Sequence, residues 1–156
     1  MRDPILWAVV MNSESARILR GVHRDGQTDA PEIEMSDSHH RLQDMMSDKP
    51  GRSFASVGKG RSAMEYASDP VRDAQRAFVH RVLERLETAR TEEGFDQLAV
   101  FASRPILGLF RQAVPPTMAA LVVREVAKNY LHLSSQDLRS TVVRLLFEQP
   151  DSAKMT

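Results

Sequence analysis

Cysteine is absent from the 156-residue sequence. Without thiols the chain forms no disulfide, has no Cys nucleophile and offers no Cys ligand to a metal ion. An excess of one charge is absent as well, because 21 Lys and Arg residues balance 21 Asp and Glu residues. This balance excludes a generally polybasic nucleic-acid-binding protein, but it leaves room for a local basic patch.

Long hydrophobic runs are also missing. The apolar run at residues 5–11 is far shorter than the roughly 20 residues that a transmembrane helix needs. Its flanks, Arg2-Asp3-Pro4 and Asn12 to Ser15, do not have the basic start and small-residue cleavage site of a secretory signal. We interpret the run as a buried β-strand and expect a cytoplasmic protein with no membrane span.

The familiar catalytic motifs are absent. The sequence has no Gly-x-Ser-x-Gly elbow, P-loop, dinucleotide fingerprint or His-Glu-x-x-His. Adjacent His39 and His40 are interpreted as solvated loop residues, because a metal site would need further ligands. We therefore expect no enzymatic activity, no metal and no cofactor. The alternative is a small-molecule enzyme with its site at the strand ends of a sheet.

The N-terminal third has the pattern of three strands followed by a long irregular segment. Strands are predicted at residues 5–11, 16–22 and 32–35, the last resting on Ile33 and Met35 alone. Asp25-Gly26 indicates a turn between the second and third strands. Residues 36–68 contain few large apolar side chains and are predicted to be a loop, which at this length is usually functional or disordered.

The rest of the chain alternates helices with strands. Asp69-Pro70 and Gly94 bound a helix with an apolar stripe, listed as Val71, Ala74, Phe78, Val82, Leu86 and Ala89. A strand at 98–102, a helix from Pro105, a short helical piece around Met118 and a strand at 122–126 follow. The last helix begins after Ser134, has an apolar face that includes Leu145 and Leu146, and ends at Pro150.

These elements predict an α/β fold. The order is β-β-β-loop-α-β-α-β-α, with a single mixed sheet and helices packed on it. We expect one domain over residues 1–150 and a frayed tail over 151–156.

Residues 47–62 are the most distinctive stretch, and we call them the basic loop. Four basic residues stand here against one acid, Asp48, and three glycines allow close backbone approach to an anion. This composition suits an RNA backbone or another anionic surface, and the alternative is a flexible, solubilising loop. The candidate anion- or RNA-binding residues are Lys49, Gly51, Arg52, Gly58, Lys59, Gly60 and Arg61. Basic residues on the following helix, Arg72, Arg76, His80, Arg81 and Arg85, would extend the positive field.

Three stretches together resemble the bacterial family known as host attachment proteins. They are Ser15 to Leu19, Ser47 to Phe54, and the region from Phe95 through Leu107–Arg111 to Leu131–Ser134. The resemblance extends over residues 5–146. One departure is Asn129, where the family commonly has Asp, and another is Ser103-Arg104-Pro105-Ile106 before the Leu-Gly pair.

The resemblance implies a non-enzymatic protein that supports attachment of a bacterium to host cells. Because no export signal is visible, we expect an indirect role, although direct contact with a host-cell surface component is the alternative. The family is similar in turn to the middle domain of archaeal and eukaryotic release factors, which implies an RNase-H-like or ribosomal-protein-like architecture. Those factors have Gly-Gly-Gln in the loop before the long helix. The equivalent place here, Gly58 to Arg61, has no Gln, so the second hypothesis is a ribosome- or RNA-associated protein without hydrolytic activity.

Overall fold

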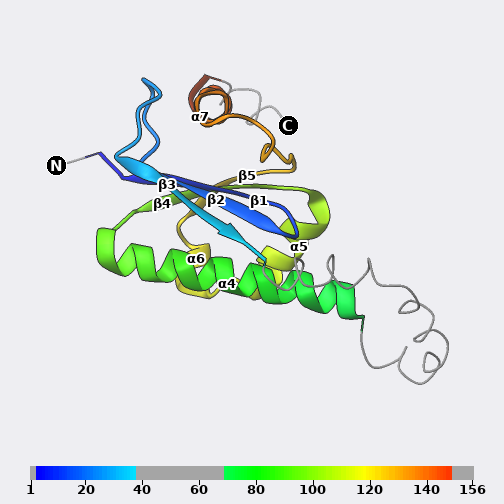
Figure 1. The fold of residues 1–156 in the computed structure, drawn as a ribbon. Helices are drawn as coiled ribbons and strands as arrows, with labels where there is room; N and C mark the ends of the chain where they lie inside the picture. The colour runs from blue at the N-terminus through cyan, green and yellow to red at the C-terminus, as the bar shows by residue number, and fades with distance from the viewer. Residues whose placement is uncertain (1–2, 38–68, 149–156) are drawn as a thin grey trace, which may run out of the picture.

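A computed structural model describes residues 3–37 and 69–148 of the chain. A five-stranded mixed sheet, in the order β3-β2-β1-β4-β5, forms the middle layer. Helices cover both faces of this sheet: α4, α5 and α6 lie on one side and α7 on the other (Figure 1). The predicted α/β class with a single mixed sheet and packed helices is confirmed.

The strands are β1 (Leu6–Met11), β2 (Ser15–Arg20), β3 (Ala30–Ser36), β4 (Gln97–Ala102) and β5 (Val122–Val126). Strand β2 pairs antiparallel with both β1 and β3, whereas β4 pairs parallel with both β1 and β5. The carboxyl ends of β1, β4 and β5 therefore meet at one edge of the sheet, next to the turn that begins β2.

The helices are α4 (Pro70–Glu93), α5 (Arg104–Ala113), α6 (Pro116–Ala119) and α7 (Ser135–Val143), and a π-helical turn, η1 (Arg144–Glu148), follows α7. Among the described residues, none of the helices combines the length and the apolar character of a transmembrane span.

Strand β1 is buried along its whole length because both of its faces meet a core. Trp7, Val9 and Met11 pack toward α4 and α5, whereas Ala8 and Val10 pack toward α7. Successive side chains of a strand point to opposite faces, so a fully apolar strand fits only between two layers. This arrangement explains why the first strand has no polar alternation.

The helix signals in the sequence are largely confirmed. Asp69 caps α4 by accepting a hydrogen bond from the backbone N–H of Arg72, and Gly94 ends this helix at a φ of 79°. Ser134 caps α7 by accepting from the backbone N–H of Asp137. Two members of the predicted apolar stripe lie outside the core cluster: Val71, in the first turn of α4, is 63% exposed, and Ala74 is half-buried.

Several boundaries and one helix differ from the prediction. Strand β3 runs over Ala30–Ser36 and is longer than the predicted 32–35. Strand β2 ends at Arg20 rather than residue 22, because Gly21 takes a φ of 89° and turns the chain away. The helical piece around Met118 is a separate helix, α6, which adds one helix to the expected order. Leu145 and Leu146 belong to the π-helical turn instead of α7. The predicted loop at 36–68 lies almost wholly outside the described residues.

Gly21→Ala tests how tightly this corner is built. A Cβ at position 21 would lie 2.2 Å from Asp29 Oδ2 and 3.0 Å from Asp29 Cβ, so the Asp29 side chain would have to rotate away from His23, its 2.9 Å partner. At Gly26, which has a similar φ of 84°, a Cβ would meet nothing within 4 Å. Both substitutions incur the backbone strain of a positive φ, but only the first also crowds a neighbour.

We expect Gly21→Ala to lower the free energy of unfolding by about 1 kcal/mol more than Gly26→Ala does. Urea unfolding followed by the fluorescence of Trp7 measures this difference, since Trp7 is the single tryptophan and stacks on Phe95 with ring centroids 4.8 Å apart. An equal decrease in the free energy of unfolding of the two variants would show that the Asp29 side chain moves aside without loss of stability.

Candidate functional site

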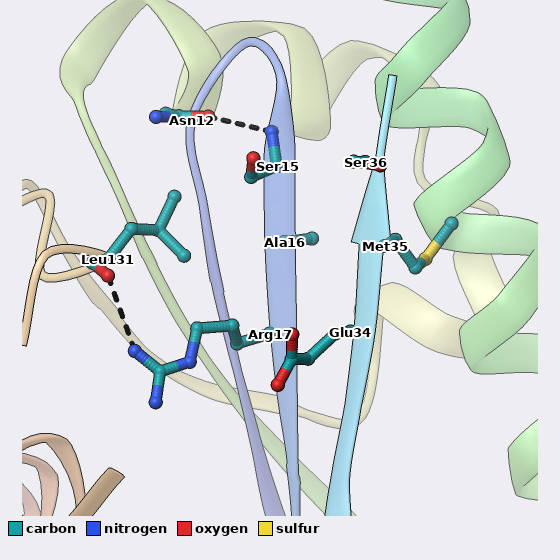
Figure 2. A pocket seen from close by; sticks show the side chains of 8 residues that line it. All are labelled: Asn12, Ser15, Ala16, Arg17, Glu34, Met35, Ser36 and Leu131. Carbon is teal, nitrogen blue, oxygen red and sulfur yellow. Dashed lines mark hydrogen bonds between the residues drawn. The ribbon is translucent and has the colours of Figure 1, made fainter. Parts of the chain in front are cut away.

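A polar pocket of about 320 Å³ lies where β1 ends and β2 begins, on the α7 side of the sheet. We call it the sheet-end pocket. Strands β2 and β3, the turn between β1 and β2, and the segment before α7 contribute its walls (Figure 2). Its lining residues are Asn12, Ser15, Ala16, Arg17, Glu34, Met35, Ser36 and Leu131.

Arg17 dominates this region through five hydrogen bonds. Its Nε and Nη2 form a bidentate ion pair with the Glu32 carboxylate at 2.8 Å and 3.0 Å. Its Nη1 donates to the backbone carbonyls of Leu133 at 2.7 Å and Leu131 at 3.3 Å, and Nη2 also donates to Ser135 Oγ at 3.3 Å. A guanidinium has five N–H groups, so its donors are fully used.

The ion pair is shielded from water, since the side chains of Arg17 and Glu32 are only 14% and 10% exposed. Arg17 therefore joins β2, β3 and the segment before α7, and it is not available as a free cation for an anionic ligand. The sequence analysis did not identify Arg17 as a site residue. A signal was present, because Arg17 lies two positions before Leu19 in an alternating strand and therefore shares its buried face.

Asn12 fixes the turn between β1 and β2. Its Oδ1 accepts from the backbone N–H groups of Glu14 at 2.9 Å and Ser15 at 2.8 Å. Because this oxygen is identified by two donors, the amide nitrogen is the group that points away from the turn, as Figure 2 shows. The side chains of Asn12 and Ser15 thus present polar groups to the pocket from the turn end.

The end of β3 is anchored to α4 at the same edge of the sheet. Asp37, whose side chain is 4% exposed, accepts from Arg81 Nη2 at 3.0 Å, and its backbone N–H donates to the Glu14 carbonyl at 2.8 Å. Arg81 also lies over the Phe78 ring, 5.3 Å from its centroid. This contact fixes the point at which the chain leaves the sheet after β3.

The site residues predicted from the sequence are not among those described. Lys49, Gly51, Arg52, Gly58, Lys59, Gly60 and Arg61 lie outside the described residues, as do His39 and His40. Their proposed role in anion binding stays a prediction.

The predicted extension of a positive field along α4 is only partly realised. Arg81 is paired with Asp37, and Arg76 donates to Asp73 at 3.1 Å one turn away. Arg72 and Arg85 have no acidic partner among the described residues. Pairing within the fold therefore cancels part of the charge that the sequence pattern counted as free.

Within residues 3–37 and 69–148, no group of three or more His, Asp or Glu side chains is placed to hold a metal ion. A charged contact near the carboxyl end of β5 joins Arg111 of α5 to Glu125 of β5. The hydrogen bond that Arg111 donates to the Glu125 carboxylate, followed by the negative charge of Glu125, raises the pKa of Arg111. An arginine is already protonated at all physiological pH values, so this shift causes no pH dependence there.

The sequence model of the family described as "Protein required for attachment to host cells" matches residues 7–142. The chain belongs to this family. The match begins within β1 and ends within α7, so it includes every strand of the sheet and the whole sheet-end pocket. No curated protein matches the chain.

Arg17 brings two of the family-like stretches together. Ser15 to Leu19 lies in β2, and its Arg17 binds the carbonyls of Leu131 and Leu133 in the other stretch. Asn129, which replaces the Asp common in host attachment proteins, accepts from the backbone N–H of Leu131 at 3.1 Å. A carboxylate could accept the same bond, so Asp at this position would keep the turn that Asn129 forms.

Arg17→Lys tests the structural role of this guanidinium. Lysine keeps the charge but is a point donor that cannot reproduce the fork, so Glu32 and two carbonyls lose partners. We expect the free energy of unfolding to fall by about 2–3 kcal/mol. Arg20→Lys on the same strand is the control. Arg20 pairs with Glu93, with side chains 22% and 35% exposed, and its Nε donates to the Pro31 carbonyl at 2.8 Å. Because these contacts are more exposed, weakening them should cost below about 1 kcal/mol. Equal effects in urea unfolding would contradict the special role of Arg17.

Proposed function

We propose that this member of the host attachment family supports attachment of a bacterium to host cells indirectly, as a non-enzymatic binding protein of the cytoplasm. The observation that carries the proposal is the family match over residues 7–142. The non-enzymatic part is supported by the chemistry of the sheet-end pocket, where the most polar group, Arg17, is saturated by structural partners.

The proposed partner is an anion, and the basic loop would bind it. In residues 47–62, Lys49, Arg52, Lys59 and Arg61 stand against the single acid Asp48. The anchored end of β3 supports this proposal from the described side, because Asp37 is tied to Arg81 and defines a fixed starting point for the segment that follows. A fixed base lowers the conformational entropy that a binding loop loses on contact with its partner.

The second candidate is a ribosome- or RNA-associated protein with an RNase-H-like architecture similar to the middle domain of release factors. A mixed sheet in which β2 alone runs antiparallel to its neighbours, with helices on both faces, is compatible with that architecture. The absence of Gly-Gly-Gln near Gly58 to Arg61 favours binding without peptidyl-tRNA hydrolysis.

Deletion of the gene tests the attachment role. We expect the deletion strain to attach less to host cells, with attachment restored by the wild-type gene. Labelling of intact cells with a membrane-impermeant reagent should leave the protein unmodified, alongside a cytoplasmic control protein. Labelling of the protein in intact cells would contradict the indirect role, and unchanged attachment of the deletion strain would contradict the attachment role itself.

The ribosome hypothesis predicts salt-sensitive binding through the basic loop. Sedimentation with ribosomes should weaken steadily as salt rises, because contacts to phosphate release counterions. The triple variant Arg52→Ala, Lys59→Ala, Arg61→Ala should lose most of this binding. The matched control removes three exposed basic residues elsewhere, Arg104, Lys128 and Arg144, and should sediment like the wild type. Equal behaviour of the two triple variants would remove the hypothesis.

A further inference from the structure

The sheet-end pocket keeps several hydrogen-bonding groups that the fold does not use. Asn12 has both amide N–H groups without an acceptor among the described residues, since its oxygen alone holds the turn. The Ser15 hydroxyl and the exposed Glu34 carboxylate also have no described partner. Figure 2 shows Asn12 and Ser15 at the turn end and Glu34 beside Arg17 on the next strand. The pocket therefore offers donors at one end and an acceptor at the other.

The charge of the pocket disfavours an anionic ligand. Arg17 and Glu32 neutralise each other, and every N–H of Arg17 already has an acceptor. Glu34 then leaves one negative charge and no free cation in the lining. A phosphate or carboxylate placed here would meet the like charge of Glu34 without a compensating cation. The unused groups therefore suit a ligand without negative charge that both donates and accepts hydrogen bonds, since Asn12 needs an acceptor and Glu34 needs a donor.

The volume of the pocket and its apolar wall limit which ligands can fit. At about 320 Å³, the pocket is at the small end of the range of ligand pockets. Leu131 lines the side opposite the strands and offers an aliphatic surface (Figure 2). A ring with hydroxyls on one edge and C–H groups on a face suits this combination: its hydroxyls donate to Glu34 and accept from Asn12, and its apolar face covers Leu131.

We propose that the sheet-end pocket binds a neutral, hydroxyl-rich ligand of about the size of one sugar ring. Asn12 donates to a ligand hydroxyl, Ser15 donates or accepts, and Glu34 accepts from one or two hydroxyls. Arg17 is a positioning residue: it holds β3 and the segment with Leu131 at the two sides of the pocket. This site uses no residue of the basic loop, so a test of ligand binding here is independent of the proposed function.

Titration of the full chain with sugars tests the proposal. The probes are the methyl glycosides of glucose, galactose and mannose, followed through the side-chain amide signals of Asn12 and the methyl signals of Leu131 in NMR spectra. We expect saturable shifts at both residues, with a Kd in the millimolar range for at least one glycoside. Glucuronate is the charged probe, and it should bind more weakly than the neutral glucoside, because its carboxylate meets the negative charge of Glu34.

Asn12→Asp is the decisive variant because it changes a donor into an acceptor. An aspartate oxygen still accepts from the N–H groups of Glu14 and Ser15, so the turn is kept while the two amide donors are lost. We expect the Kd to rise by about tenfold. Asn129→Asp is the matched control. The Asn129 side-chain oxygen also accepts from a backbone N–H, that of Leu131, but Asn129 does not line the pocket. The Kd of this variant should match that of the wild type.

Ser15→Ala provides a second test that leaves the Asn12 turn untouched, and it should also raise the Kd. Trp7 fluorescence verifies that each variant is folded. Three results would overturn the proposal: no saturation with any of the three neutral glycosides, tighter binding of glucuronate, or folded Asn12→Asp and Ser15→Ala proteins that bind like the wild type.

Discussion

The saturated guanidinium of Arg17 is the constraint on which much of this structure depends. It holds β2 against β3 through Glu32 and binds the carbonyls of Leu131 and Leu133 before α7. Hydrogen bonds to a charged group are stronger than neutral ones, and a partly buried charge without partners would be costly. One side chain on a strand thereby links the sheet to the layer that covers it.

This link matters because the two layers differ in how they are attached. The face toward α4 and α5 is a broad apolar core that includes three buried phenylalanines, listed as Phe78, Phe95 and Phe110. The face toward α7 has a smaller buried cluster around Phe101 and Leu138. Toward the end of the strands this second face becomes polar. There the hydrogen bonds of Arg17, in place of apolar contacts, hold the segment before α7 on the sheet. The sheet-end pocket is the space that remains at this transition.

Two different recognition chemistries follow from this arrangement and from the sequence. The basic loop combines cations with glycines and would suit an anionic surface, whereas the sheet-end pocket has no free cation and suits a neutral ligand. They lie in different parts of the chain, so one can be altered without the other.

The sequence by itself determined the class and most of the elements, because local signals decide them. Short continuous apolar runs placed β1 and β4, and apolar periodicity placed α4. Asp69, Gly94 and Ser134 marked helix ends by side-chain and backbone chemistry that acts within a few residues. Only the tertiary structure decided the strand order, the corner at Gly21 and the pairing of Arg81 with Asp37. It also decided that Arg17 would meet carbonyls more than 110 positions away in the chain. No local pattern encodes such contacts, because they depend on how separate segments meet once the core has formed.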